Sequence, residues 1–373
     1  MKKLKILEIC EFSAGVCGVW TRVKQEAIEL AKKGYEVRVF SSNIVKGTTE
    51  KASSYEEIEG IKICRFPVKF KIGENALFWN FEKKALELAP DIIIAHVYRH
   101  PHTNQALKIE KILKAKGKKC KIFLVTHAPF VSSKIRGFKL TLLTKIYDLF
   151  YAKNLNKFDK IITITKWEIP YLFSLGAKKE KIVYIPNGIP LPFFKTKQSK
   201  FNFKNIIFLG RIAPVKNLET LFKAYEIVYK KNKNINLEII GPIEQNYNIK
   251  ENFKSIKFLP PIYDLNKKIK KLNSSDMFVL PSKREAMPQA LIEAMALGKI
   301  VISSNTDGGR EIIENKKNGF LFKIGDEKQL ANIILFCLDK KNKKIIEKIR
   351  KNARKKAFEF SWEKLINKLT SLF

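Results

Sequence analysis

The sequence predicts an α/β protein built from two Rossmann-like, doubly wound parallel-sheet domains that face each other across a cleft. Segments with strand and helix patterns alternate along the chain, and the alternation begins a second time after a linker-like stretch at residues 190–203. The apolar runs of the strands are continuous, as expected for strands covered on both faces. With 373 residues, 45% of them hydrophobic, the chain is long enough for two domains with separate cores.

The first half opens with a βαβ unit. A strand at residues 4–9 is followed by a loop with Gly15 and Gly18, a helix at 19–33, Gly34, and a second strand at 35–40. This order is the building block of a doubly wound parallel sheet. The pattern continues with strands at 61–66, 91–97, 121–127, 160–165 and 181–189, and with helices at 76–89, 103–116 and 138–157.

The second half repeats this alternation. Its predicted strands are 205–210, 237–241, 256–260, 277–281 and 299–304, and its predicted helices are 217–232, 288–297 and 326–339. The final stretch, 342–373, has helical spacing with Trp362 and Leu365 on its apolar side. We therefore place an N-terminal domain at 1–195, a C-terminal domain at 196–355 and a C-terminal helix at 356–373.

The chain is strongly basic, with a formal net charge of +36. Such a charge attracts polyanions, and an anionic membrane surface is one candidate partner. The alternative is a composition effect, since the cations are mostly lysine amid many Ile and Asn residues. No arginine cluster of the kind that nucleic-acid recognition uses is present, so nucleic acid is not an expected partner.

Cysteine usage and the N-terminus indicate the compartment. The five cysteines are scattered and form no C-x-x-C pair, which favours neither a zinc ribbon nor a disulfide framework. The basic start lacks the apolar run of a signal peptide, because Glu8 and Glu11 interrupt it, and no stretch is long and apolar enough to span a membrane. We expect a cytoplasmic protein, with peripheral attachment to the cytoplasmic membrane face as an option.

Ligands of parallel sheets bind outside the carboxyl ends of strands, beside helix N-termini, and a cleft between two domains is the default site. The loop from Gly15 to Gly18 follows the first strand, so its backbone N–H groups could approach a phosphate. It lacks the third glycine of a dinucleotide fingerprint and the lysine of a P-loop. A plain tight turn is the alternative.

A second candidate loop, 210–218, follows the first strand of the second half. Arg211 and Lys216 are five residues apart beside a helix start, where Asn217 is a candidate N-cap. Two such cations could hold a pyrophosphate. A solvated loop in a lysine-rich protein is the alternative.

A third candidate segment runs from Pro281 to Gly298. Glu285 precedes a helix whose first turn suits Pro288, and Glu293 falls two turns further on, amid an otherwise apolar face. A carboxylate in that position needs a partner. Ribose hydroxyls are one such partner, and a structural salt bridge is the other.

Two further features follow predicted strands. Glycines in the segment 307–311 open a helix, so its amides could meet a phosphate, although a glycine turn with an exposed charge pair explains it equally. His127 ends the strand 121–127, which places it at the cleft, although a lone histidine is more often structural. His96, His100 and His102 cluster after another strand, but no nearby carboxylate or thiol completes a metal site, so no metal is predicted.

These segments together resemble the retaining glycosyltransferases of family 4 (glycosyl transferases group 1), which have the GT-B fold. The E-x7-E spacing of Glu285 and Glu293 is similar to the family's signature. The resemblance extends over nearly the whole chain. Residues 18–37 resemble the N-terminal loop and helix, 185–189 the interdomain segment, 210–218 the donor-phosphate loop, and 360–364 the start of the C-terminal helix that crosses back to the first domain.

The resemblance implies a role for each matching residue. Arg211 and Lys216 would neutralise the donor's diphosphate, a task that other transferases give to a divalent metal. Glu293 would hold the ribose, Glu285 would lie near the transferred sugar or its departing phosphate, and His127 would orient that sugar. Backbone contacts to the phosphates or the sugar are implied at three more positions, Gly18, Met287 and Pro288.

The implied activity is transfer of a hexose-type sugar from a UDP- or GDP-linked donor to a glycan or lipid-linked acceptor, with retention and with no cofactor or metal. Fixed cations in a dry cleft would stabilise the leaving diphosphate, and attack on the same face, assisted by the leaving phosphate, is the working hypothesis. The alternatives are another reaction on the same scaffold, a phosphorylase or a nucleotide-sugar epimerase, and a non-enzymatic polyanion-binding protein.

The segment from residue 134 to residue 160 combines many apolar with many basic side chains. An interfacial helix of this composition would hold the protein on an anionic bilayer, near a lipid-linked acceptor. An ordinary domain helix with a solvated basic face is the alternative.

Overall fold

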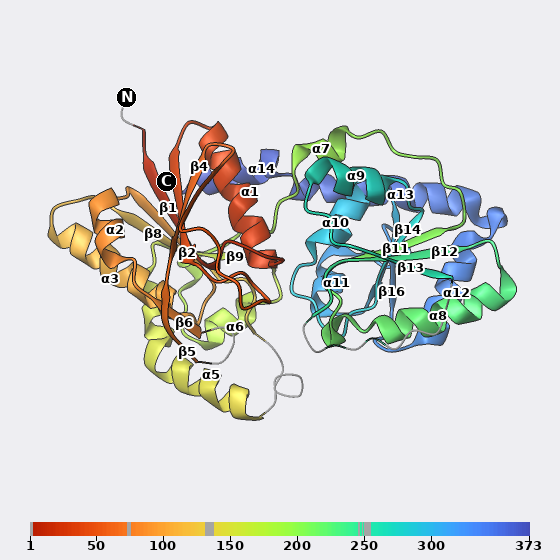
Figure 1. Ribbon diagram of the computed structural model, residues 1–373, viewed down its shortest axis with the longest axis horizontal. Coiled ribbons are helices and arrows are strands. Elements are labelled where there is room, and N and C mark those ends of the chain that lie inside the picture. Colours follow the sequence, from red (N-terminus) through yellow and green to blue (C-terminus); the bar gives the residue numbers. More distant parts are fainter. Residues whose placement is uncertain (1–2, 73–75, 131–137, 245–246, 248, 250–254) are drawn as a thin grey trace. The chain divides into compact units, whose positions relative to one another are not determined.

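The computed structural model describes the chain except for residues 1–2, 73–75, 131–137, 245–246, 248 and 250–254. The chain divides into two compact units, each built around a parallel sheet (Figure 1). Unit 1 comprises residues 1–188 and 365–373, and unit 2 comprises residues 189–364. Among the described residues no helix has the length and apolarity needed to cross a membrane.

Unit 1 contains an eight-stranded sheet with the order β10-β9-β8-β7-β1-β2-β4-β3. Its neighbours pair in parallel except for β3 and β4, which pair antiparallel. The order reverses between β1 and β7, which is where doubly wound sheets bind ligands. The strands are β1 (Lys5–Phe12), β2 (Glu36–Ser42), β3 (Tyr55–Ile58), β4 (Ile61–Phe66), β7 (Ile92–His96), β8 (Lys121–Val125), β9 (Lys160–Thr163) and β10 (Ile182–Tyr184).

Helices cover both faces of this sheet. Alternate residues of a strand point to opposite faces: Leu7 and Ile9 of β1 join the apolar core formed with α2 and α3, and Glu8 points to the other face, where α1 packs. Figure 1 shows α1 and α3 on opposite sides of the sheet. The helices of unit 1 are α1 (Gly18–Lys32), α2 (Glu82–Leu88), α3 (Pro101–Ala115), α5 (Phe138–Tyr151) and α6 (Ile169–Ser174).

Unit 2 contains a six-stranded, wholly parallel sheet with the order β13-β12-β11-β14-β15-β16. Its order reverses between β11 and β14, so the carboxyl ends of these two strands mark the expected ligand position. The strands are β11 (Asn205–Leu209), β12 (Asn236–Ile240), β13 (Ile256–Leu259), β14 (Met277–Leu280), β15 (Ile300–Ser304) and β16 (Phe320–Phe322).

Helices also flank this second sheet, with α8 and α12 packed against each other and α10 packed against α13 (Figure 1). The helices of unit 2 are α7 (Leu191–Lys195), α8 (Leu218–Lys231), α9 (Leu265–Asn273), α10 (Gln289–Ala296), α11 (Asp307–Ile312), α12 (Glu327–Leu338) and α13 (Lys343–Ala357). A last helix, α14 (Trp362–Thr370), begins in unit 2 and ends in unit 1.

The predicted α/β fold is confirmed, and one predicted helix is partly wrong. Residues 76–89 begin as the strand β6 (Ala76–Trp79), which pairs antiparallel with β5 (Val68–Ile72), and become helical only at Glu82. Leu77 and Trp79 are buried in the core of unit 1, and aromatic residues of this kind favour strands. The short strands β3, β5, β6 and β16 are too brief, at three to five residues, to give a clear periodic pattern.

Candidate active site

Three loops meet at the carboxyl edge of the sheet in unit 2. The backbone N–H of Lys283, after β14, donates to the carbonyl oxygen of Val215, after β11, at 2.8 Å. The N–H of Gly308, after β15, donates to the carbonyl oxygen of Glu285 at 3.1 Å. Backbone hydrogen bonds therefore fix the three candidate segments of this half against one another, at the point where the strand order reverses.

Lys216 and Glu285, which are 69 positions apart in sequence, form an ion pair at this edge. The Nζ of Lys216 lies 2.7 Å from Oε1 of Glu285, and the Oγ of Ser282 donates to the same oxygen at 2.6 Å. Both charged side chains are partly shielded, with 20% and 10% of their surface exposed. The carboxylate holds the lysine in one place without removing it from solvent.

Two details of the helix starts differ from expectation. Asn217 occupies the N-cap position of α8, but its φ of 53° is left-handed and its side chain makes no cap hydrogen bond to the backbone. Its Nδ2 instead donates to Oγ1 of Thr220 at 2.8 Å, so Asn217 is the N-cap residue, as predicted, but it makes no side-chain hydrogen bond to the helix backbone. Pro288 is the N-cap of α10, one residue before the first turn, and Met287 is buried beside it.

The glycine-rich start of α11 is shaped by close packing. A Cβ added at Gly308 would lie 2.5 Å from the carbonyl oxygen of Ala286, nearer than side chains approach backbone. The side chain of Thr306 caps the helix by accepting the N–H of Gly309 at 3.0 Å. Asp307 and Arg310 form an exposed ion pair. This segment therefore contributes close-packed backbone to the loop that carries Glu285.

Arg211 and Glu293 pair with residues that the sequence did not single out. Arg211 lies 3.3 Å from Glu244, with about two fifths of each side chain exposed. The Oε1 of Glu293 lies 2.6 Å from Nζ of Lys268 in α9, and the carboxylate is 2% exposed. The structural salt bridge considered for Glu293 is therefore present. Lys268 was not predicted because it stands in a lysine-rich helix without any distinguishing pattern.

His127 follows β8 in unit 1, on a strained backbone. Its φ is 57° and that of Ala128 is 48°, a left-handed conformation that non-glycine residues adopt mainly where the surroundings enforce it. The carboxylate of Glu168 provides that support, since its Oε2 accepts the N–H of Ala128 at 3.0 Å and the hydroxyl of Thr126 at 2.6 Å. Burial raises the pKa of Glu168 to about 7.

A hydrogen-bonded chain leads from His127 into the interior of unit 1. The Nε2 of His127 lies 2.9 Å from Nδ1 of His96, whose Nε2 lies 2.5 Å from Oε2 of Glu8. His96 and Glu8 are fully buried. The expectation that no carboxylate stands near the histidine cluster is wrong: Glu8 bonds to His96, and Glu11 lies 3.2 Å from His100. Both carboxylates are about ninety positions from their histidines, so local spacing could not reveal them.

Glu8 shares its buried environment with an ion pair from α1. The guanidinium of Arg22 lies 2.8 Å from Oε2 of Glu26, and both side chains are fully buried. Glu8, Glu26 and His96 bring three potential metal-ligand atoms within 4.8 Å of one another. Arg22 already supplies one positive charge to this cluster. Its guanidinium also donates hydrogen bonds to the carbonyl oxygens of Ile185 and Pro186.

Burial shifts the proton affinities of this cluster. It raises the pKa of Glu8 to about 8 and that of Glu26 to about 7, and Arg22 opposes both shifts. It lowers the pKa of His96 to about 3 and holds the pKa of His127 well below its usual value. The two histidines are therefore neutral at physiological pH.

Gly18 is the first residue of α1, in unit 1. A Cβ at this position would meet no atom within 4 Å, so the surrounding protein leaves room for a side chain there. Packing therefore does not require a glycine at position 18, whereas it does at position 308.

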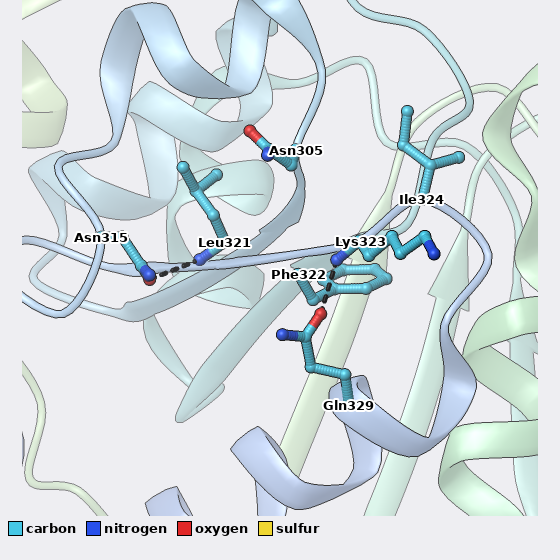
Figure 2. A pocket seen from close by; sticks show the side chains of 7 residues that line it. All are labelled: Asn305, Asn315, Leu321, Phe322, Lys323, Ile324 and Gln329. Atoms are coloured by element: carbon cyan, nitrogen blue, oxygen red, sulfur yellow. Dashed lines mark hydrogen bonds between the residues drawn. The ribbon is translucent and has the colours of Figure 1, made fainter.

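A separate open pocket lies at the edge strand of unit 2 (Figure 2). Figure 2 shows two of its polar side chains already bonded to backbone, Asn315 to the N–H of Leu321 at 3.0 Å and Gln329 to the N–H of Lys323 at 2.6 Å. None of the predicted donor-binding residues lines it. Its lining residues are Asn305, Asn315, Leu321, Phe322, Lys323, Ile324 and Gln329.

Comparisons with known proteins agree with this architecture. Residues 16–192 match the family described as Glycosyltransferase Family 4, and residues 193–356 match Glycosyl transferases group 1. An uncharacterized glycosyltransferase of Haemophilus influenzae is 33% identical over 171 residues, which cover 44% of this chain and 47% of that protein. The chain thus spans about half the length of this relative.

Two further matches extend over more of the chain. The Escherichia coli protein named UDP-Gal:alpha-D-GlcNAc-diphosphoundecaprenol alpha-1,3-galactosyltransferase is 27% identical, over 74% of each chain. The solved structure of HepE from Anabaena, in complex with UDP and glucose, superposes with a TM-score of 0.69 at 17% identity and covers 99% of this chain and 98% of that one. At this identity the structural match concerns the fold alone.

Proposed function

This chain belongs to the family 4 glycosyltransferases of GT-B fold, and we propose that it transfers a hexose-type sugar from a UDP- or GDP-linked donor to a glycan or lipid-linked acceptor. We further propose that the reaction retains the anomeric configuration and requires no metal.

The observation that carries this proposal is the Lys216–Glu285 pair at the carboxyl edge of the sheet in unit 2. When a glycosyl diphosphate breaks, negative charge develops on the departing phosphate. A fixed ammonium group stabilises that charge more in the transition state than in the ground state, which is what catalysis requires. Because Glu285 holds Lys216 at 2.7 Å, the cation is already positioned before the donor arrives. Arg211, half-exposed on the same loop, can rotate to add a second cation.

The other proposed donor contacts are those that the family resemblance implies. Glu293 accepts hydrogen bonds from the ribose hydroxyls with its second oxygen while Lys268 keeps the first. The backbone at Met287, Pro288 and Gly18 contacts the phosphates or the sugar, and His127 orients the sugar. With no protein nucleophile assigned, the acceptor attacks on the face that the phosphate leaves, and the phosphate takes its proton.

The donor and acceptor classes are supported by the relatives. HepE binds UDP and glucose in its solved structure, and the Escherichia coli relative is named for a UDP-Gal donor and a diphosphoundecaprenol-linked acceptor. A nucleoside diphosphate with an attached hexose is the ligand that a lysine, an arginine and two carboxylates, on adjacent loops and the helix that follows, suit best.

The test is a thermal-shift screen over UDP- and GDP-sugars in the presence of EDTA, followed by analysis of the products. A donor at 100 times its dissociation constant stabilises the folded chain by about 2.7 kcal/mol. We expect one nucleotide class to raise the melting temperature and its sugar to reach an acceptor with its anomeric configuration kept. Requirement for added metal, inversion, phosphorolysis or epimerisation would each refute the corresponding part of the proposal.

We also propose that α5 docks on an anionic bilayer and brings the enzyme to a lipid-linked acceptor. Its inner side is fixed to unit 1, since Asp148 accepts hydrogen bonds from Tyr98 at 3.0 Å and from Arg99 at 2.9 Å. Figure 1 shows α5 at the edge of unit 1. Its outer side carries exposed large apolar residues, Leu142, Leu143, Ile146, Leu149, Phe150 and Tyr151.

Cations flank this apolar side, and they match the expected charge of the bilayer. Lys145, Lys153 and Lys157 are exposed on or just after α5. Two further cations of the basic segment 134–160, Lys134 and Arg136, lie outside the described residues. An apolar side flanked by lysines is the pattern of helices that lie in an anionic membrane interface.

Liposome flotation tests this docking. The chain is expected to float with vesicles containing phosphatidylglycerol and to float less with pure phosphatidylcholine. The double variant Leu149→Glu with Phe150→Glu should abolish flotation, and the same change at exposed apolar positions of unit 2, Ile324→Glu with Ile345→Glu, should not. Equal flotation of both double variants would refute a role for α5.

A further inference from the structure

The hydrogen-bonded chain from Glu8 to His127 connects the interior of unit 1 with the carboxyl end of its sheet. Glu8 lies in β1, His96 ends β7, and His127 follows β8, so the chain crosses three adjacent strands at the point where the strand order reverses. The Nε2 of His127 is engaged with His96. Among the described residues no hydrogen bond reaches its Nδ1, which is the ring nitrogen left for a ligand.

We propose that Glu8 and His96 are positioning residues that decide, through two hydrogen bonds, whether Nδ1 of His127 donates or accepts. A neutral imidazole carries one proton, so one nitrogen donates and the other accepts. His96 uses its Nε2 toward Glu8 and its Nδ1 toward His127, and His127 uses its Nε2 toward His96. The direction of the bond at Glu8 therefore fixes the direction of the bond at His127.

The proton on Glu8 is what sets that direction. Two buried carboxyl groups, Glu8 and Glu26, face the single guanidinium of Arg22 from β1 and α1, and His96 faces them from β7. Arg22 compensates one carboxylate, and its ion pair is with Glu26 at 2.8 Å. A second uncompensated carboxylate would be costly in a site where all four side chains are fully buried. Glu8 is therefore the carboxyl group that keeps a proton.

That proton belongs on the oxygen next to His96. Oε2 of Glu8 lies 2.5 Å from Nε2 of His96, and a side-chain hydrogen bond with Glu26 favours the charged form of Glu8 without reversing the effect of burial. The Glu8 hydroxyl then donates to His96, Nδ1–H of His96 donates to Nε2 of His127, and Nδ1–H of His127 becomes the donor offered to a ligand. Burial raises the pKa of Glu8 to about 8, so this state prevails at neutral pH.

Loss of one proton reverses both bonds without charging either ring. The Glu8 proton moves to Nε2 of His96, the Nδ1 proton of His96 moves to Nε2 of His127, and the Nδ1 proton of His127 leaves to solvent. The net change is one proton lost and one negative charge gained, on Glu8. His127 then offers a bare Nδ1, which accepts a hydrogen bond. Imidazolium is excluded throughout, because burial and the neighbouring His96, Arg22 and His100 disfavour it.

For the enzyme, this inference rests on the proposed role of His127 toward the donor sugar. An Nδ1–H directed at a sugar hydroxyl oxygen binds it as a donor and leaves the hydroxyl proton for another acceptor. After the reversal, the same nitrogen would compete for that hydroxyl proton. The buried carboxyl of β1 thus acts on the sugar through two side chains, without touching it.

Nitrogen-15 NMR of the histidine-labelled full chain tests this directly and needs no substrate. The chain contains only four histidines, and loss of one ring signal in His127→Gln assigns that residue. We expect Nδ1 of His127 to be protonated at pH 6.5 and bare at pH 9.5, with no imidazolium shift between. In Glu8→Gln the amide at this position does not titrate, so one tautomer should persist over the whole range.

The matched control is Glu110→Gln, which removes a buried carboxyl of α3 that pairs with Lys114 and should leave the pH step in place. If Glu8→Gln does not fold, His96→Asn is the second variant. It interrupts the series of hydrogen bonds between Glu8 and His127, so it should also remove the pH-dependent change of the His127 tautomer. A step that survives in Glu8→Gln or in His96→Asn, no step in the unaltered chain, or an imidazolium signal would overturn the proposal. The NMR experiment contains no donor. A chain that fails to bind or transfer a nucleotide-sugar would therefore refute the proposed function without changing what the NMR experiment says about the His127 tautomer.

Discussion

The backbone N–H of Gly308 donates to the carbonyl oxygen of Glu285 at 3.1 Å, so the first turn of α11 packs directly on the loop that carries the candidate catalytic carboxylate. A glycine is required at this contact, because any Cβ would enter the backbone of Ala286 and Glu285. The position of Glu285, and through it that of Lys216, depends on this close approach.

Gly308→Ala should therefore displace the loop. The added Cβ would lie 2.5 Å from a carbonyl oxygen, which forces the backbone to shift and costs about 1–3 kcal/mol of stability. We expect a lower melting temperature together with weaker donor binding in calorimetry. Gly18→Ala, where a Cβ has open space, should keep the stability of the unaltered chain. Equal melting temperatures for the two variants would contradict the packing argument.

Lys216→Ala should impair catalysis far more than folding. Removing a cation that stabilises the leaving phosphate is expected to lower kcat by about 100–1,000-fold, measured as donor turnover. The melting temperature should change by only a few degrees, since the pair with Glu285 is partly exposed. Lys271→Ala, which breaks a similarly exposed pair with Glu238 in the same unit, is the control and should keep full turnover. Comparable losses in both variants would remove the specific role of Lys216.

Lys268→Ala should destabilise unit 2 because it leaves Glu293 buried without its partner. Breaking a buried ion pair by removing one member costs about 3 kcal/mol, and the Glu293 carboxylate is only 2% exposed. Urea unfolding followed by circular dichroism should show a lower midpoint. Lys230→Ala breaks an exposed pair with Glu226 and should change the midpoint little. A stable Lys268→Ala chain would mean that Glu293 finds another partner.

His102 should make stability fall with acid. Its Nε2 donates to the carbonyl oxygen of His96 at 2.7 Å, and burial lowers its pKa to about 3. Below about pH 6.5 the unfolded chain binds a proton there that the folded chain refuses, so unfolding becomes easier by about 1.4 kcal/mol per pH unit. Above pH 6.5 the neutral His102 costs the folded chain no stability, and the free energy of unfolding falls as the pH drops from about 6.5 toward about 3.

The measurement is urea unfolding at pH 6.5, 5.5 and 4.5. His102→Gln keeps a side-chain N–H donor but cannot titrate, so its unfolding free energy should fall less steeply with acid than that of the unaltered chain. His100→Gln, at the partly exposed N-cap position of the helix that contains His102, shows what a substitution here does by itself. Parallel pH curves for the unaltered chain and His102→Gln would disprove the linkage.

The fold was largely predictable because its information is local. Continuous apolar runs, helical spacing and glycines between them identify strands and helices within windows of about ten residues. Lys216 and Glu285 on their loops, and Glu293 on the helix that follows, could also be named in advance, since active-site positions of parallel sheets follow the strands. The strand β6 was mistaken for helix because only tertiary pairing with β5 separates the two in so short a segment.

The partners of these residues could not be named from the sequence. Glu293 pairs with Lys268 and Arg211 with Glu244, yet nothing local distinguishes these from the many other charged residues of so basic a chain. In the sequence, Glu8 is notable only because it interrupts the apolar run at the N-terminus. In the structure it is the buried partner of His96.

By itself, the sequence determined the order of strands and helices, the two-sheet α/β architecture and the loops that hold the candidate site. The tertiary structure alone decided which side chains meet: Lys216 with Glu285, and Glu8 with His96 and His127. The physical reason is range. Helix and strand formation depends on neighbours in sequence, but ion pairs and hydrogen-bonded chains depend on which strands lie side by side, and sheet order is set by packing of the whole unit.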